Sequence, residues 1–138
     1  GHVRRNAAKY GVKPDRIGIL GFSAGGTVAL SVAMNYAPET RPDFVAPIYP
    51  AYHWTLKGRG VPADAPPLFV LAATDDPLQL APHSVQIYQD WVRAGRPAEL
   101  HLYAKGGHGF GMRKQDLPSD RWIQLFADWL AMQGWLQR

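Results

Sequence analysis

The chain has 138 residues, of which 46% are hydrophobic and 19% are charged, and its formal net charge is +4. This balance is typical of a folded chain, and it excludes a largely disordered one. The absence of cysteine excludes disulfides, thiolate zinc sites and a cysteine nucleophile. We therefore expect a single domain over residues 1–138, with no apolar run of membrane-spanning length.

Hydrophobic periodicity predicts alternating helices and strands along the chain. Helices are expected over 2–10, 24–36, 82–94 and 120–132, and strands over 16–22, 44–49, 68–73 and 98–103. Gly11 and Gly95 should close the first and third helices, and Ser119 should cap the last. A long loop is expected over 50–66. This alternation predicts a parallel sheet with right-handed crossovers. The last helix carries five apolar residues at core-facing spacing: Trp122, Leu125, Phe126, Trp129 and Leu130.

The most informative segment follows the first expected strand. Residues 21–25 read Gly-Phe-Ser-Ala-Gly, the G-x-S-x-G pattern of a sharp strand-to-helix turn that exposes a serine hydroxyl. We expect Gly21 and Gly25 to be required because a side chain at either position would collide with the turn. The backbone N–H groups that begin the next helix, first that of Ala24, would face a developing oxyanion.

Two later segments supply the remaining groups of a serine hydrolase, in the order serine, acid, histidine. Asp75 and Asp76 end the third expected strand, at the edge where ligands of parallel α/β sheets gather. His108 lies in a glycine-rich loop just beyond the fourth strand. Ser23 needs a base to remove its proton, and that base needs a carboxylate to fix its tautomer.

With these motifs in place, the chain resembles the α/β-hydrolase esterases related to acetyl-xylan esterases. It is similar more distantly to dienelactone hydrolases and the prolyl oligopeptidase group. The matching stretches cover nearly the whole chain: residues 6–11, 14–26, 41–50, 75–84 and 94–111. The resemblance implies a minimal α/β-hydrolase fold of about four parallel strands flanked by helices. It also implies Ser23 as nucleophile, His108 as base, and Asp75 or Asp76 as the partner of His108.

The two neighbouring aspartates should point in opposite directions, so only one is expected to reach His108. Family members place the acid three residues before an aliphatic position, and Leu78 fits that pattern for Asp75. Another hydrolase branch uses the aspartate of an Asp-Pro-Leu tripeptide, which would select Asp76. The spacing to the Ala-Gly pair at 94–95 favours Asp75, and we choose Asp75 as the triad acid.

The sequence departs from the family pattern at its start. Members carry further N-terminal strands and a His-Gly-Gly loop that supplies part of the oxyanion hole, and this chain has neither. The strand before Ser23 should therefore lie at an exposed edge of the sheet. An apolar edge strand offers unpaired backbone groups, so we expect a homo-oligomer formed through that edge.

These features favour a serine carboxylesterase that hydrolyses short-chain acyl esters through an acyl-enzyme. The alternative is a non-catalytic or partner-completed hydrolase remnant that acts as a binding subunit, and a peptidase is a third reading. The candidate walls of an acyl pocket are Tyr49, Tyr52, His53 and Trp54.

The remaining expectations concern other ligands and location. We expect a small-molecule ester as substrate, with no cofactor and no metal, because the histidines lack ligand spacing. The basic residues are scattered and accompany no recognition motif, so nucleic-acid binding is not expected. No segment has the pattern of a signal peptide, which favours a cytoplasmic location.

Overall fold

The structure is a computed structural model that describes residues 1–52, 56 and 58–136. Its elements are, in chain order, α1 (His2–Arg5), α2 (Ala7–Tyr10), β1 (Ile19–Phe22), α3 (Ala24–Met34), the 3-10 helix η1 (Pro38–Thr40), β2 (Val45–Ile48), β3 (Leu68–Ala73), α4 (Ala81–Arg93), β4 (Ala98–Tyr103), the 3-10 helix η2 (Pro118–Arg121) and α5 (Trp122–Met132). The four strands and the helices that flank them confirm the predicted α/β class.

The four strands form one parallel sheet in the order β1-β2-β3-β4. Gly21 of β1 is level with Pro47 of β2, and Ala73 of β3 is level with Tyr103 of β4. Because all neighbours are parallel, the carboxyl ends of the strands meet at one edge, where an open α/β sheet binds ligands. β1 lies at one side of the sheet, as predicted for the strand that precedes Ser23.

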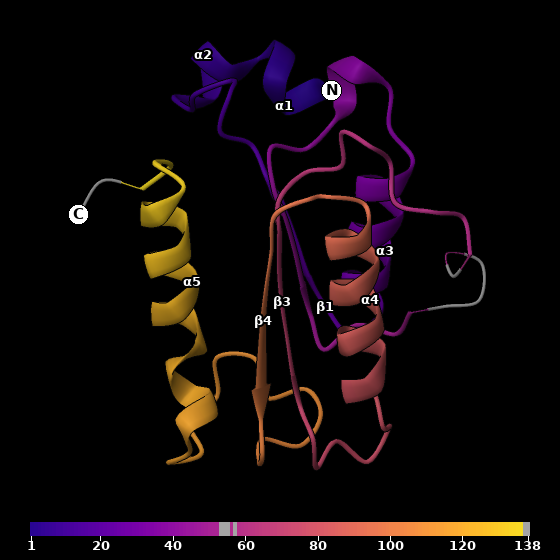
Figure 1. Cartoon of the computed structure of the whole chain (residues 1–138). Coiled ribbons are helices and arrows are strands. Elements are labelled where there is room, and N and C mark those ends of the chain that lie inside the picture. The colour runs from indigo at the N-terminus through magenta and orange to yellow at the C-terminus, as the bar shows by residue number, and fades with distance from the viewer. Residues whose placement is uncertain (53–55, 57, 137–138) are drawn as a thin grey trace.

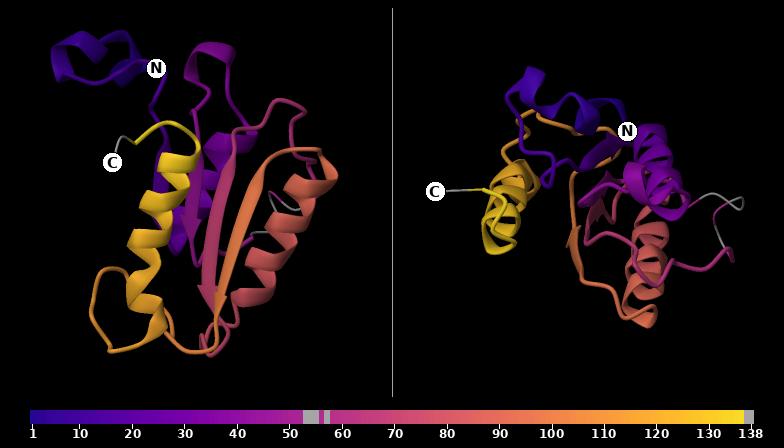
Figure 2. Two further views of the ribbon diagram at one scale, coloured as in Figure 1. Left: turned by 60° about the vertical axis from the view of Figure 1, so that its left-hand side comes forward. Right: turned by 90° about the horizontal axis from the view of Figure 1, so that it is seen from above.

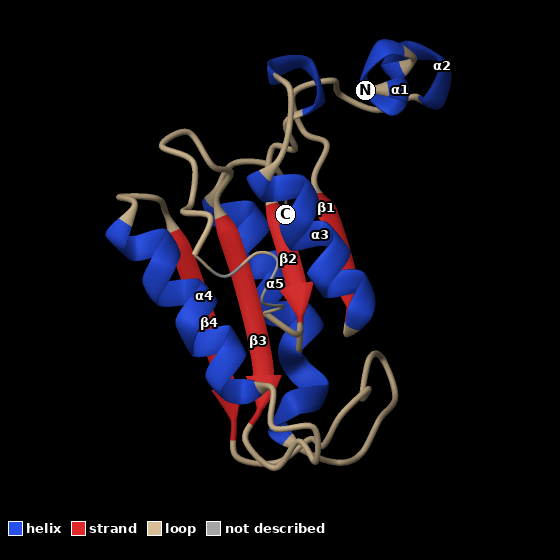
Figure 3. Cartoon of the chain, turned by 90° about the vertical axis from the view of Figure 1, so that its right-hand side faces the viewer, coloured by secondary structure: helices blue, strands red, loops and turns tan. Residues whose placement is uncertain are grey.

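Helices cover both faces of the sheet. Figures 1 and 2 show α3 and α4 on one face and α5 on the other. α3 packs on β1 and β2, and α4 packs on β3 and β4. The short helices α1 and α2 lie beyond the end of the sheet opposite to the carboxyl ends of the strands (Figure 3). No helix among the described residues is long and apolar enough to cross a membrane.

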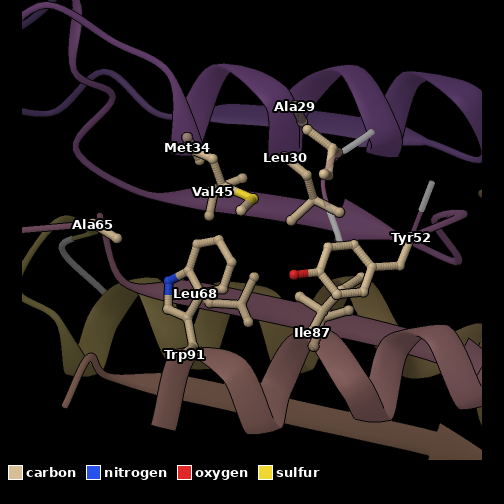
Figure 4. Packing of buried hydrophobic residues seen from close by; sticks show 12 residues of the cluster. Ala29, Leu30, Met34, Val45, Tyr52, Ala65, Leu68, Ile87 and Trp91 are labelled. Carbon is tan, nitrogen blue, oxygen red and sulfur yellow. The ribbon is translucent and has the colours of Figure 1, made fainter. Parts of the chain in front are cut away.

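Two buried clusters hold the layers together. Between the sheet and α3 and α4, Leu30, Leu68 and Trp91 are fully buried, and Figure 4 shows how these side chains converge. The indole N–H of Trp91 donates a 2.8 Å hydrogen bond to the carbonyl of Pro66, so this large ring is buried without an unpaired polar atom.

The second cluster lies between the sheet and α5. Phe126 and Trp129 pack against Phe69, with ring centroids 5.1 and 5.6 Å from it. The core-facing spacing predicted for the last helix is confirmed, because Trp122, Phe126 and Trp129 are buried and Leu125 and Leu130 pack against them.

Several helix ends, and the ends of β2, differ from the prediction by one or two residues, and three other features differ more. The first helix is divided at Asn6, whose side-chain amide donates to the carbonyl of His2 and competes with the backbone ladder. The first strand begins at Ile19 rather than at residue 16. Ser119 does not cap the last helix, because it lies within η2 and the residue before α5 is Arg121. Gly11 does end α2 in the left-handed conformation, as predicted.

Candidate active site

Ser23 occupies the turn between β1 and α3. Its backbone has φ 50° and ψ −119°, a conformation that costs energy for a residue with a side chain. Its N–H donates to the carbonyl of Ile48 at 2.9 Å, and its own carbonyl accepts from the N–H of Thr27 at 3.1 Å. The strained residue is therefore fixed to β2 on one side and to the first turn of α3 on the other.

The two glycines of the motif have different roles. A Cβ at Gly21 would lie 2.1 Å from the carbonyl oxygen of Gly25, which confirms that position 21 needs glycine. A Cβ at Gly25 would meet nothing within 4 Å, so the expectation that a side chain there would collide is wrong. Gly26 is the crowded neighbour, because its Cβ would lie 3.1 Å from both the Gly21 carbonyl and Pro50.

This difference gives a direct test of the turn. We expect Gly21→Ala to lower the free energy of unfolding by about 1–3 kcal/mol or more, because the added methyl overlaps backbone that cannot move away. Gly25→Ala should leave stability unchanged or raise it by up to about 1 kcal/mol, because alanine is the better helix former. Thermal and urea unfolding of the two variants would measure both effects. Equal losses in the two variants would contradict this view of the turn.

Ser23 and His108 come together across 85 positions of sequence. The Ser23 hydroxyl oxygen lies 2.8 Å from Nε2 of His108, which is hydrogen-bond distance. Both residues follow strands of the parallel sheet, Ser23 after β1 and His108 after β4. The structure thus brings together the two residues that the sequence analysis paired.

The carboxylate beside His108 belongs to Asp76, not to Asp75. Oδ2 of Asp76 lies 2.8 Å from Nδ1 of His108, and its Oδ1 accepts the N–H of Leu78 at 2.8 Å. The Asp76 side chain is fully buried, whereas Asp75 is exposed and accepts the N–H of Gly107 at 2.7 Å. The choice of Asp75 as the partner of His108 is therefore wrong. The Asp-Pro-Leu pattern that selects Asp76 was the sequence feature that identified it.

The hydrogen bond to Asp76 determines what His108 offers to Ser23. An ionised carboxylate only accepts hydrogen bonds, so Nδ1 of His108 carries a proton and donates it in the hydrogen bond to Asp76. In the neutral ring, Nε2 then has a free lone pair directed at the serine hydroxyl. The arrangement can take the proton of Ser23 as an acyl carbon is attacked.

Ala24 is the first residue of α3. The first N–H groups of a helix have no acceptor within the helix, so the N–H of Ala24 is positioned as the sequence predicts for an oxyanion donor. Its role in binding an oxyanion remains a prediction.

The ring of Tyr49 packs beside that of His108. Its ring centroid is 5.1 Å from that of His108 and 6.0 Å from that of Phe22. Its side chain is buried, and burial raises the pKa of its phenol, which therefore stays protonated at neutral pH. Tyr52 instead points into the core and donates to Asp90 at 2.9 Å. The other two suggested pocket walls, His53 and Trp54, lie outside the described residues.

Two cavities lie away from Ser23. One of about 510 Å³ is lined by residues of α4, by Thr74 and Gln79, and by Leu102 of β4. Another of about 500 Å³ lies by Tyr52 and the carboxyl-terminal half of α4. Neither is lined by Ser23, His108 or Asp76, so neither defines where an acyl group would bind.

Known hydrolases are similar to this chain in sequence and in structure. The chain is 27% identical over 157 aligned positions to an acetylxylan esterase of Xylanibacter ruminicola, covering 93% of this chain and 33% of that protein. Its structure is similar to that of an acetyl ester-xyloside bifunctional hydrolase from Caldicellulosiruptor lactoaceticus, with a TM-score of 0.88, 27% identity, and coverage of 99% of this chain and 63% of that one.

A third relative is MGS-M1, an α/β hydrolase from a deep-sea metagenome library of the Medee basin. It gives a TM-score of 0.79 at 27% identity, with coverage of 95% of this chain and 60% of that one. The chain therefore spans about a third of the length of the acetylxylan esterase and about three-fifths of each solved structure.

The family comparison extends over the same residues as the fold and the site. The model of the dienelactone hydrolase family matches residues 2–138, which include all four strands and the residues Ser23, Asp76 and His108. The chain belongs to the dienelactone hydrolase family.

Proposed function

We propose that this protein is a serine carboxylesterase that hydrolyses short-chain acyl esters through an acyl-enzyme intermediate. The observation that carries the proposal is the continuous line of hydrogen bonds from the Ser23 hydroxyl through His108 to the buried Asp76 carboxylate, each 2.8 Å long. Such a line supplies a nucleophile, a base and a group that orients the base, which are the three requirements of acyl transfer by serine.

In the first half of the reaction, the Ser23 oxygen attacks the ester carbonyl carbon and Nε2 of His108 takes the hydroxyl proton. The carbonyl oxygen becomes an anion, which the N–H of Ala24 would stabilise. As the tetrahedral intermediate collapses, His108 gives its proton to the leaving alcohol, and the acyl group stays on Ser23. The Asp76 carboxylate stabilises the imidazolium while it carries the extra proton.

In the second half, water replaces the alcohol. His108 takes a proton from water as the water oxygen attacks the acyl carbon, and it returns that proton to Ser23 as the acid leaves. An ester is a more suitable substrate than an amide for this chain. Amides have the poorer leaving group, so transfer of their acyl group to Ser23 is the more demanding reaction.

The short acyl group is supported by the relatives. The acetylxylan esterase and the acetyl ester-xyloside hydrolase both have names that refer to acetyl esters.

Hydrolysis of p-nitrophenyl acetate, butyrate, octanoate and decanoate tests the proposal. We expect kcat/KM to be highest for acetate and to fall with chain length, with a burst of p-nitrophenol if release of the acid is slow. A chain that hydrolyses none of these esters would contradict the esterase proposal and favour a subunit that a partner must complete. A maximum at decanoate would contradict the short-chain preference alone.

We also propose that a second copy of the chain pairs with the free side of β1. Within the described residues β1 pairs only with β2, and its Leu20 and Phe22 are 37% and 39% exposed. An apolar edge strand readily adds another strand, because its N–H and C=O groups have no partner on that side.

Analytical ultracentrifugation tests this pairing. We expect the mass to rise with concentration toward twice that of one chain. Leu20→Lys should shift the equilibrium back to the monomer, because a charge on an edge strand opposes pairing. The control is Val28→Lys, which adds the same charge at an exposed position of α3. A wild-type mass that stays that of one chain at every concentration would rule the dimer out.

A further inference from the structure

The loop that carries His108 contains three glycines in the left-handed conformation. Gly107, Gly109 and Gly111 all have positive φ, at 66°, 70° and 48°. Glycine has more conformational freedom than any other residue, so a segment with this composition is easily displaced unless something outside it fixes its course. A base must stay within hydrogen-bond distance of its nucleophile, so the loop needs such support.

Four side chains from outside residues 106–111 supply it through hydrogen bonds to the backbone of the loop. Asp75 accepts from the N–H of Gly107 at 2.7 Å, and Tyr49 accepts from the N–H of Gly111 at 3.1 Å. Gln115 donates to the carbonyl of Gly106 at 3.0 Å, and Trp122 donates to the carbonyl of Gly111 at 2.7 Å. The loop is therefore held on both sides of His108.

Asp75 differs from the other three in charge and position. It is the only one of the four that is a carboxylate, and a hydrogen bond from an N–H to a carboxylate is stronger than one to a neutral acceptor. The N–H that it accepts belongs to Gly107, the residue directly before His108. The next residue, Asp76, binds the ring of His108 itself. One turn after β3 thus holds both the backbone and the side chain of the histidine.

We propose that Asp75 is a positioning residue that fixes the backbone before His108 and so keeps Nε2 of His108 within reach of Ser23. This inference rests on the esterase function proposed above. Asp75 acts through the geometry of the loop and touches neither the ring nor the substrate. Its role requires an acceptor oxygen at the position of Oδ1, and the negative charge only strengthens the bond.

This distinction determines the expected effects. Asp75→Ala removes the acceptor and should lower kcat/KM for p-nitrophenyl acetate by about three- to tenfold, mostly in kcat, since the exposed bond contributes modestly. Asp75→Asn keeps an acceptor oxygen and should recover most of the lost activity. Asp15→Ala is the matched control, because it removes an exposed aspartate before β1, away from the carboxyl ends of the strands. It should change neither kcat nor KM.

A second measurement reads the histidine directly and needs no turnover. The proton shared by Nδ1 of His108 and Asp76 gives a far-downfield NMR resonance, and its exchange with water reports how firmly the ring is held. We expect faster exchange, and a broader resonance, in Asp75→Ala than in wild type and Asp75→Asn. Thermal unfolding of each variant would separate a local effect from loss of the fold.

The outcomes separate the two proposals. If Asp75→Ala matches wild type in both kcat and proton exchange, or if Asp75→Asn is as damaging as Asp75→Ala in both, the positioning role is overturned. If the wild-type chain hydrolyses no ester, the proposed function fails. The exchange of the His108 proton still decides whether Asp75 fixes the loop.

Discussion

Ser23→Ala is expected to abolish ester hydrolysis. Removing the nucleophile from a serine hydrolase costs up to about 10⁶-fold in kcat, and the residual rate then comes from substrate binding and oxyanion contacts alone. In this chain we expect a loss of at least about 10³-fold for p-nitrophenyl acetate. The fold should be unaffected, because the Ser23 hydroxyl contacts only His108 among the hydrogen bonds described and alanine fits the same turn.

Ser31→Ala is the matched control for this experiment. Ser31 lies on α3, two turns after Ser23, and the hydroxyl beside His108 is that of Ser23. We expect its kcat and KM to equal those of wild type. Activity that survives intact in Ser23→Ala would contradict the assignment of the nucleophile and would direct attention to another hydroxyl or to a contaminating esterase.

Asp76→Asn is expected to give the second largest loss. An amide at this position can present its NH₂ group to His108, which favours the tautomer with its proton on Nε2 and removes the lone pair that Ser23 needs. The same change in a serine protease lowers kcat by about 10⁴-fold, and we expect a loss on the order of 10³- to 10⁴-fold here. Steady-state kinetics from pH 5 to pH 9 would measure it.

Asp75→Asn provides the comparison that decides between the two aspartates. This variant replaces the same kind of carboxylate by an amide, but the side-chain oxygen of residue 75 accepts from the N–H of Gly107 and does not contact the histidine ring. Its loss should be smaller than that of Asp76→Asn by at least about 100-fold. A larger loss in Asp75→Asn would contradict the geometry and support the choice made from spacing alone.

Most of the fold follows from short-range patterns in the sequence. β3 and β4 begin and end where the apolar runs predict, because their flanking prolines, glycines and aspartates limit them locally. The start of β1 was not predictable in this way. The N–H of Ile17 donates to the carboxylate of Asp43, which is also paired with Arg4 at 3.1 Å. Ile17 and Arg4 precede Asp43 by 26 and 39 positions, so no local sequence pattern reveals these contacts.

The site likewise contains residues that local motifs identify and one residue that they do not. Ser23 and His108 were identified from their motifs, because a strained turn and a glycine-rich loop each leave a characteristic composition. The choice between Asp75 and Asp76 depends on which carboxylate is turned inward after β3, and that is set by the packing of the turn over 73–79. Asp76 is buried because its own N–H bonds back to Ala73 and its Oδ1 accepts from Leu78. Alternation along a strand does not extend into such a turn.

Tyr49 and Gln115 show why supporting residues escape sequence analysis. Tyr49 binds the backbone of Gly111, which is 62 residues later in the chain, and Gln115 binds the backbone of Gly106, which is nine residues earlier. Neither belongs to a motif. Their effect depends on the sheet order and on the course of the loop, which only the folded chain defines.

Covalent labelling of the serine tests the central claim most directly. The chain is incubated with a p-nitrophenyl phosphonate, digested, and analysed by mass spectrometry. We expect one phosphonyl group per chain, on the peptide that contains Ser23, with labelling lost in Ser23→Ala and slowed at least about 100-fold in His108→Gln. An unlabelled Ser23, or labelling at the same rate without the imidazole, would contradict it.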